Sequence, residues 1–307
     1  MRRRFVPGAF AALTALAVMA AGCSDSSTSG GSTTSVTDTA ATIPVTGPAT
    51  TEVITSTSGA TTSEPTSTTQ PLAAEPVLVY FLAGELLHVG GRLVPAATPA
   101  AAVEALLAGP TADERADGLV SLVPAGTRLL GLVVDGNEAV VDLSAEFNSG
   151  GGSLSVTGRV AQVVYTVTHF AGIDTVRFSI DGSIVTELTG EGLDVTAVHR
   201  LDLVDMAPFI LLETPWDGQE VSSPIVVTGM SNTFEAQVNY EVLSPAGAVL
   251  AEGWFMATSG TGTWGTFDAT LAPLPAGTTG EVVVRLFEVS PENGQHVSVH
   301  EVTVRLA

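Results

Sequence analysis

The stretch RLLGLVVDGNEAVVDL, residues 128–143, contains two apolar runs that are separated by a short polar segment. Leucine, valine and alanine dominate both runs, and the many valines favour extended strands. The segment between the runs, Asp135-Gly136-Asn137, supplies the glycine and the short polar side chains that a tight turn needs. The stretch therefore predicts a β-hairpin, from which the neighbouring elements can be read in both directions.

The residues on either side of this hairpin predict two helices and further strands. Residues 98–110 carry a helix signature, because Thr98 can cap the first turn, Pro99 suits the first helical position and Gly109-Pro110 ends the helix. Valines at helical spacing predict a second helix over residues 155–170. Further strands are expected at residues 77–82, at LLHV and RLV (86–89 and 92–94), which together form one short strand, and, as a second hairpin, at 175–188. This order predicts an α+β domain over residues 76–205, a mixed sheet with two helices on one face.

The last hundred residues, 206–307, contain only strand patterns, with turn residues between them. Seven short strands at this spacing predict an all-β immunoglobulin-like sandwich. The chain has a single cysteine, so the sandwich lacks the cross-sheet disulfide of antibody domains. Asn293-Gly294 suits a type I′ turn in the last hairpin. The expected strands are residues 209–213, 224–230, 234–243, 247–257, 264–271, 280–289 and 296–306.

The amino-terminal residues have the order of an export signal. A basic MRRR precedes a mostly apolar run, and small residues precede the lone Cys23. Residues 1–22 thus resemble a lipoprotein signal peptide, with Ala20 where such signals most often have leucine. We expect Cys23 to be lipidated, with acyl chains such as palmitate, which anchors the exported protein at the extracytoplasmic face of the cell membrane. An ordinary signal peptide cut near the same place and an uncleaved anchor are the alternatives.

Residues 23–75 are rich in serine and threonine and contain no aromatic residue. Such a segment cannot bury a core, so we expect a disordered linker. A flexible coil of about 50 residues spans on the order of 40 Å, enough to hold the folded part away from the membrane. The composition also permits O-glycosylation, whereas the simpler interpretation is a plain spacer.

The charge balance excludes some partners. The chain has 32 acidic and 11 basic residues, a net charge of −21, and all its basic residues are arginine. Nucleic-acid binding depends on Lys and Arg that neutralise phosphates, so we expect no nucleic-acid partner. Anionic lipid surfaces would repel the folded part for the same reason.

Several separated motifs of the α+β block resemble the GerMN domain, named from bacterial sporulation and spore-germination proteins. They are the ALLAGP helix end, the VPAGT turn, VDLSAEF, RVAQVVYT and the final IDG hairpin. The tail departs from the family, because Ala197-Val198-His199 precede Arg200 where a proline is usual, which leaves the domain's carboxyl edge open. Residues 213–238, followed by WGTF and FEVSPENG, are similar to the immunoglobulin-like domain that often follows GerMN in bacterial envelope lipoproteins.

The resemblance implies a non-catalytic envelope lipoprotein that makes protein contacts in sporulation, germination or cell-wall-associated assemblies. Envelope proteins are the expected partners, and self-association is expected because GerMN domains are similar to ring-building modules. No nucleophile–base pair, phosphate loop or HExxH pair occurs in the sequence, so no catalytic, cofactor or metal site is expected. The acidic cluster Asp113, Glu114 and Asp117 is interpreted as a solvated face.

The three tryptophans leave a second function open. Trp216, Trp254 and Trp264 all lie in the sandwich block, where they could pack in the core or line a carbohydrate surface. In the second case the protein would bind peptidoglycan or another glycan, as an accessory to a wall hydrolase. A pull-down with purified cell wall would discriminate between the two functions.

Overall fold

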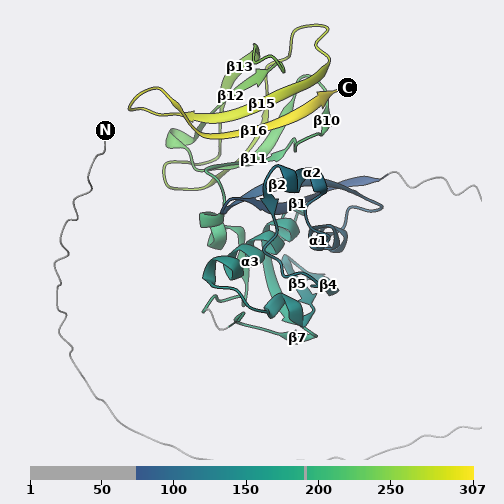
Figure 1. Ribbon diagram of the computed structural model, residues 1–307. Helices are drawn as coiled ribbons and strands as arrows, with labels where there is room; N and C mark the ends of the chain where they lie inside the picture. The colour runs from purple at the N-terminus through teal and green to yellow at the C-terminus, as the bar shows by residue number, and fades with distance from the viewer. Residues whose placement is uncertain (1–73, 190–191) are drawn as a thin grey trace, which may run out of the picture. The chain divides into compact units, whose positions relative to one another are not determined.

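The computed structural model describes residues 74–189 and 192–307 (Figure 1). The predicted signal peptide, the lipidation site Cys23 and nearly all of the predicted linker lie outside these residues, so those expectations stay predictions. No helix within the described ranges is long and apolar enough to cross a membrane.

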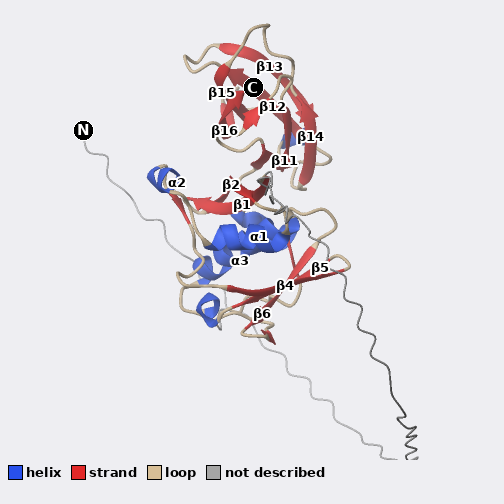
Figure 2. Ribbon diagram, turned by 90° about the vertical axis from the view of Figure 1, so that its right-hand side faces the viewer, coloured by secondary structure: helices blue, strands red, loops and turns tan. Residues whose placement is uncertain are grey.

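The first domain contains two sheets (Figure 2). The smaller sheet has the strand order β2-β1-β3, and the larger one has the order β4-β5-β6-β7, with β8 also paired to β6. Strands β5 and β6 are parallel and the other pairs are antiparallel, so the larger sheet is mixed, as predicted. The strands are β1 (Glu75–Ala83), β2 (Leu86–Val94), β3 (Leu119–Val120), β4 (Leu129–Asp135), β5 (Glu138–Leu143), β6 (Thr175–Ile180), β7 (Ser183–Ile184) and β8 (Val198–His199).

Two helices lie between these sheets, as Figure 2 shows. Helix α1 (Pro99–Leu107) contacts β1 and β4, and helix α3 (Ser153–Thr168) contacts β1 and β6. The α+β class and the two helices on one face of a mixed sheet are therefore confirmed. The second sheet was not predicted, because the run at residues 77–82 was assigned to the same sheet as the hairpins. That run is buried throughout, since its two faces are both covered.

The helix signals in the sequence acted as expected at α1. The Thr98 side chain accepts a hydrogen bond of 3.2 Å from the backbone N–H of Ala101, and Pro99 opens the helix. Gly109, just past the end, has φ +80°, which favours glycine. Helix α2 (Ala112–Ala116) was not predicted. Thr111 and Glu114 form a capping box at its start, and the sequence TADE, residues 111–114, has the pattern of such a box.

Helix α3 is buried over most of its surface because it lies between the two sheets. Its valines pack into the core, which confirms helix over the strand that their propensity favours. Three polar side chains on it, Arg159, Gln162 and Thr166, are also buried. A helix buried on nearly all sides must satisfy such groups internally.

The second domain is a sandwich of two sheets, with strand orders β10-β16-β15-β12-β13 and β14-β11-β9. The seven predicted strands are all present, and the immunoglobulin-like fold is confirmed. At Asn293-Gly294 only Gly294 has positive φ (+71°), so the expected type I′ turn, which needs two such residues, is not formed. The strands are β9 (Ile210–Thr214), β10 (Glu220–Val221), β11 (Val226–Ser231), β12 (Gln237–Leu243), β13 (Val249–Met256), β14 (Gly265–Thr270), β15 (Gly280–Val289) and β16 (His296–Leu306).

The hydrophobic core continues from the first domain into the second. Leu211 of β9 and Met230 of β11 belong to the same buried cluster as the α3 valines, whereas the sandwich has a separate cluster of its own. The short 3-10 segments are η1 (Ala145–Asn148), η2 (Arg200–Met206), which contacts α3 and β2, and η3 (Phe234–Ala236). The two domains thus share apolar packing at their junction.

Candidate functional site

The three candidate tryptophans do not converge on one site. Trp216 and Trp264 are partly buried and pack against the core cluster of the first domain, so they belong to the junction and not to the sandwich core. Trp254 lies on strand β13 and is 62% exposed. The candidate lipidation site, Cys23, lies outside the described residues. A single surface lined by all three tryptophans is therefore not formed.

The Trp216 indole packs against strand β2 at Gly91, which has no side chain. A Cβ atom added to Gly91 of β2 would lie 2.1 Å from Nε1 of the Trp216 indole, far inside contact distance. Gly91 thus lets the indole lie directly on the backbone of β2. This packing ties the loop after β9 to the first domain, in addition to the shared apolar cluster.

A buried ion pair lies at the same junction. Arg200, from η2, contacts Glu213 of β9 with 2.5 Å between Nη1 and Oε1. The hydroxyl of Tyr80, on β1, donates to the same Glu213 oxygen. Arg200 Nη2 lies 3.1 Å from the Tyr80 hydroxyl oxygen and 2.9 Å from the backbone carbonyl oxygen of Tyr165. Its Nε donates to Thr168 at 2.8 Å, and the guanidinium also faces the Tyr80 and Tyr165 rings.

Electrostatics keep this network in one protonation state. Burial raises the pKa of Tyr80 well above its ordinary value, so the phenol stays neutral. Burial alone would raise the pKa of Glu213, but the Arg200 charge and the hydrogen bonds from Tyr80 and Arg200 lower it, so the carboxylate stays ionised. Burial raises the pKa of Tyr165 to about 12. An ion pair of this kind, in which Tyr80 and Arg200 both donate to one Glu213 oxygen, holds three elements of the fold together.

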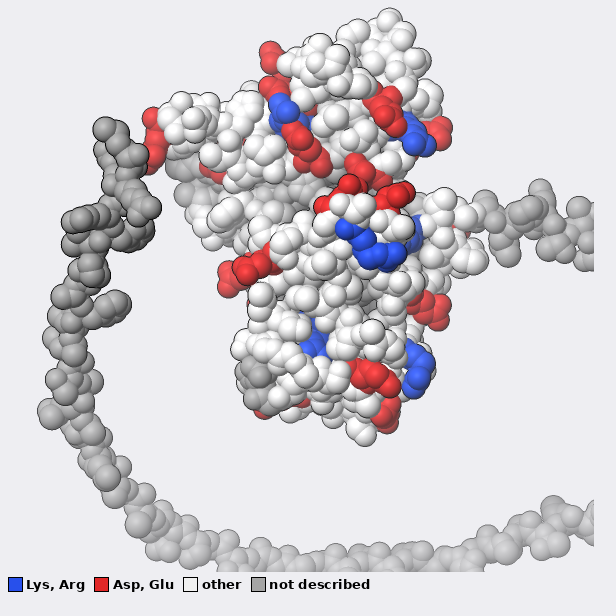
Figure 3. All heavy atoms as spheres, viewed as in Figure 1, with Lys and Arg blue, Asp and Glu red and all other residues white. Residues whose placement is uncertain are grey.

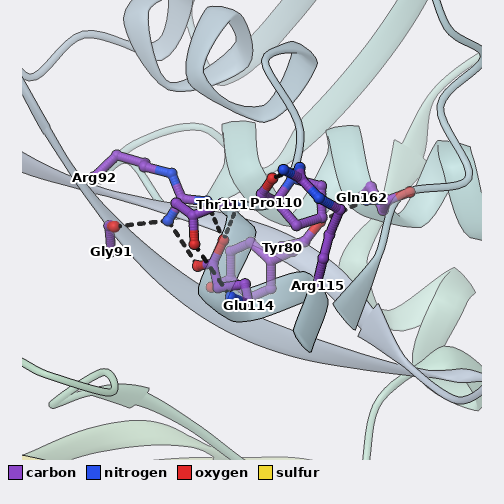
Figure 4. A network of polar contacts seen from close by, with 8 residues as sticks. All are labelled: Tyr80, Gly91, Arg92, Pro110, Thr111, Glu114, Arg115 and Gln162. Carbon is purple, nitrogen blue, oxygen red and sulfur yellow. Dashed lines mark hydrogen bonds and ion pairs between the residues drawn. The ribbon is translucent and has the colours of Figure 1, made fainter. Parts of the chain in front are cut away.

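A second polar network lies on the first domain. Figure 4 shows Arg92 of β2 facing Glu114 of α2, with nitrogen–oxygen distances of 2.8 Å and 2.6 Å in a bidentate pair. Glu114 also accepts from the backbone N–H of Thr111 at 2.7 Å. Burial would raise the pKa of Glu114, but the hydrogen bonds from Arg92 and Thr111 lower it. The interpretation of Asp113, Glu114 and Asp117 as a solvated face is therefore wrong for Glu114, which fastens α2 to β2.

The polar residues of the RVAQVVYT motif are structural. Arg159 is buried, and its guanidinium donates to the backbone carbonyls of Phe147, Ser149 and Gly150. Gln162 donates to the Tyr80 carbonyl at 2.9 Å (Figure 4). The side-chain carbonyl of Gln162 accepts from the Leu122 N–H at 2.7 Å. These side chains satisfy backbone groups of loops and strand β1, which helices and sheets leave unpaired.

Two histidines from different domains stack on each other at the junction. The His88 ring of β2 lies 5.8 Å from the His300 ring of β16, with 14° between their planes. Burial lowers the pKa of both, and that of His300 falls to about 4. A cavity of about 280 Å³ beside His88 is lined by the carboxylates Glu114, Asp117, Asp217 and Glu301.

Acidic residues are spread over both domains on the face that Figure 3 shows, while basic residues are few. Within residues 74–189 and 192–307, no group of three or more His, Cys, Asp or Glu side chains could hold a metal ion. The imidazole of His296 stacks on Phe287 at 3.6 Å, and that of His169 lies edge-on to Phe170. These histidines therefore contribute to packing.

Comparison with known families agrees with the two-domain fold. Residues 78–186 match the family model Germane, described as sporulation and spore germination. Residues 209–295 match Gmad2, the immunoglobulin-like domain of bacterial spore germination. The chain is thus a two-domain protein of the spore-germination class. Its first domain belongs to the Germane (GerMN) family and its second domain to the Gmad2 family, and neither description names a reaction.

Solved structures with some likeness include a putative lipoprotein from Clostridium perfringens. It is 19% identical with a TM-score of 0.32, and the match covers 44% of this chain and 93% of that one. The first GerMN domain of the sporulation protein GerM from Bacillus subtilis is 24% identical, with a TM-score of 0.35 and coverage of 42% and 99%. The tandem GerMN domains of GerM are 16% identical, with a TM-score of 0.37 and coverage of 65% and 62%. Likeness at this level carries no functional assignment. The curated proteins gave no match.

Proposed function

We propose that this protein is a non-catalytic envelope lipoprotein, anchored through Cys23 at the outer face of the cytoplasmic membrane. Its two folded domains make protein contacts in a germination-like or cell-wall-associated assembly. The observation that carries the proposal is the junction, where Tyr80, Arg200 and Glu213 join the domains through a largely buried hydrogen-bond network.

The junction supports a scaffold because a shared apolar cluster and buried hydrogen bonds connect the two domains. Residues that could act in acid–base chemistry are used there for packing and hydrogen bonding instead. Trp216 adds apolar contact across the same junction. A protein of two connected domains presents an outer surface on each of them, which suits an adaptor within an assembly.

The exposed edge of the mixed sheet is our candidate surface for self-association. Strand β4 is the last strand of that sheet and pairs only with β5. Leu130, Val133 and Val134 on it are exposed, with Val133 at 65%. An open edge with apolar side chains favours pairing with another copy. The family resemblance led to the same expectation.

Sedimentation of the full-length chain in detergent over a concentration series tests self-association. We expect a concentration-dependent increase in sedimentation coefficient that Val133→Lys abolishes, because a charge on the edge opposes pairing. Trp254→Lys, also on an exposed strand but in the other domain, is the matched control and should leave the increase unchanged. A strict monomer at high concentration would count against the proposal.

The lipid anchor is tested separately. Cells that express the full-length chain and are fed an alkyne fatty acid should yield a labelled protein, and Cys23→Ala should remove the label. A protein that remains unlabelled in membrane fractions would contradict the anchor. Crosslinking in intact cells, followed by mass spectrometry, would then identify the protein contacts.

The second candidate function is binding of peptidoglycan or another glycan, as an accessory to a wall hydrolase. The observation in its favour is Trp254, a large aromatic side chain that lies exposed on a sheet face. Exposed aromatic residues of this size on a folded domain often mark a contact surface. Binding of the full-length chain to purified cell wall, and its loss in Trp254→Ala, would support this function.

A further inference from the structure

The outer face of the five-stranded sheet carries aromatic, apolar and amide side chains in neighbouring rows. Trp254 of β13 lies directly opposite Asn239 of β12, and Met256 lies opposite Gln237. Side chains at opposed positions of paired strands project from the same face, with Cβ atoms about 5 Å apart. Trp254 and Met256 are both more than half exposed, while the two amides are partly covered. The amides therefore lie beside an exposed indole at the edge of the sheet.

The two amides are held in a defined orientation. Gln237 Nε2 donates to Asn239 Oδ1 at 2.9 Å, and the Asn239 amide nitrogen makes only a long contact of 3.5 Å with the carbonyl oxygen of Phe287. The Gln237 carbonyl oxygen and part of the Asn239 donor capacity are thus available to a ligand. One acceptor and one donor side by side can bind the hydroxyl groups of a sugar ring, each of which both donates and accepts.

A second aromatic residue borders the amides on the side away from Trp254. Phe234 is more than half exposed, and its backbone N–H donates to Glu288 at 3.1 Å. A depression of about 140 Å³ is lined there by Phe234, Gln237, Asn239 and Glu288. Because β12 lies between β13 and β15, the amides separate Trp254 from this depression.

The backbone beneath Phe234 is strained. Glu235 and Ala236 follow each other with φ of +53° and +60°, a region that non-glycine residues rarely adopt. The hydroxyl of Thr233 just before them is buried, and the described residues offer it no hydrogen-bond partner. Consecutive left-handed residues beside an unsatisfied buried group are costly, and such strain concentrates at binding sites. The strained turn is what brings Phe234 to the surface.

The charges around this face favour a neutral ligand. Arg285 and Arg305 are the arginines on the strands of this sheet, and each is already paired with a glutamate. Glu235 and Glu288 add negative charge near the depression. An anionic polymer would be repelled, whereas the hydroxyl and acetamido groups of a neutral sugar can donate to Glu288 and bind both amides.

We propose that the Trp254–Gln237–Asn239–Phe234 face binds a neutral polysaccharide chain. One sugar ring packs its apolar face on Trp254, the next binds the amides, and a third packs near Phe234. This site rests on the second candidate function and does not depend on self-association through β4, which lies in the other domain.

The test uses the full-length chain in detergent and a soluble β-1,4-linked N-acetylglucosamine hexamer as the probe, with titration calorimetry and tryptophan fluorescence. We expect binding of the hexamer, at least tenfold weaker in Trp254→Ala and about fivefold weaker in Gln237→Ala. Ile184→Ala, an exposed isoleucine on β7 of the first domain, is the matched control and should bind as the unchanged protein does. Circular dichroism shows whether each variant has folded.

Two results would overturn the glycan site. One is that the unchanged protein binds neither the hexamer nor insoluble wall polysaccharide. The other is that Trp254→Ala folds and binds the hexamer as well as the unchanged protein. If Trp254→Ala instead loses a crosslinked protein partner while no sugar binds, the face docks a protein and the glycan site is wrong. A monomeric protein that still binds the hexamer would refute self-association alone.

Discussion

Two arginine–glutamate networks of this protein lie in different environments: Arg200 with Glu213 at the domain junction, and Arg285 with Glu241 and Glu301, here called the Arg285 ladder. Arg200 and Glu213 are largely buried between the domains, and tyrosine, threonine and carbonyl groups take up the remaining donors. Arg285 lies on the outer face of the sandwich between Glu241 and Glu301, at 2.8 Å and 2.5 Å, and its side chain is 30% exposed. The nitrogen–oxygen distances in the two ion pairs are alike. We therefore expect any difference in their contribution to the free energy of unfolding to come from burial.

The comparison shows that the distance within an ion pair does not by itself tell how much the pair contributes to the free energy of unfolding. Breaking a buried pair leaves a charge without solvent, whereas an exposed pair exchanges its partner for water. The tryptophans repeat the lesson. Trp216 packs against Gly91 at the junction, whereas Trp254 is 62% exposed, although both lie in the same domain. The four predictions below test this contrast, from the largest expected effect to the smallest.

Glu213→Ala should give the largest loss. It leaves the Arg200 guanidinium buried without its carboxylate, which costs about 3–5 kcal/mol of unfolding free energy. Urea unfolding followed by circular dichroism measures the loss. The matched change at Arg285 is Glu301→Ala, because the Glu301 side chain is 46% exposed. Equal losses in the two variants would refute the contrast between the networks.

Acidification should weaken the junction at the His88–His300 stack. The pKa of His300 is lowered from 6.5 to about 4 by burial and by the neighbouring His88, so the folded state favours the neutral ring. Asp217 and Glu114 partly oppose the corresponding shift at His88. The contribution of the neutral His300 ring to the free energy of unfolding is complete above pH 6.5. It falls by about 3 kcal/mol as the pH drops towards 4.

Thermal or urea unfolding at several pH values measures this slope. His300→Gln should flatten the loss of stability between pH 6.5 and 4, since glutamine does not titrate there. A slope that is unchanged in His300→Gln would show that other groups carry the acid sensitivity.

Gly91→Ala should destabilise the protein by about 1–3 kcal/mol, because the added methyl group meets the Trp216 indole in a packed junction. Gly131→Ala is the control, since a Cβ atom there has ordinary contacts and lies in the neighbouring sheet. In a Trp216→Leu background the Gly91→Ala cost should shrink. Additive losses in the double variant would argue that the two sites do not touch.

Arg285→Ala should have the smallest effect, at most about 1 kcal/mol, because the ladder is exposed to solvent. Salt at about 1 M should remove most of what remains, since the Debye length is then about 3 Å. Stability measured in low and high salt checks this. A loss as large as that of Glu213→Ala would mean that the outer face is shielded from water in the folded protein.

Much of the local structure could be predicted from the sequence. Thr98, Pro99 and Gly109 mark the ends of α1, and the Asp135-Gly136-Asn137 turn marks the first hairpin. The TADE capping box of α2 was present in the sequence and was overlooked. These features could be found because capping and turn formation involve residues within about four positions of one another.

The junction could not be predicted in this way. Glu213 ends an otherwise apolar strand, which could have marked it as a buried charge, but its partner was not evident. Tyr80 lies 133 positions from Glu213 and 120 positions from Arg200, so no local period relates them. Likewise, nothing in the sequence around Gly91 indicates that the Trp216 indole packs against it.

The sequence by itself determined the strands, the helices and the order of the two domains, because each depends on short-range periodicity and turn chemistry. Only the tertiary structure decided that the first domain has two sheets around its helices. It also decided which tryptophan packs at the junction and which faces solvent. Those outcomes depend on which surfaces meet after the chain has folded, and contacts between distant residues leave no periodic pattern in the sequence.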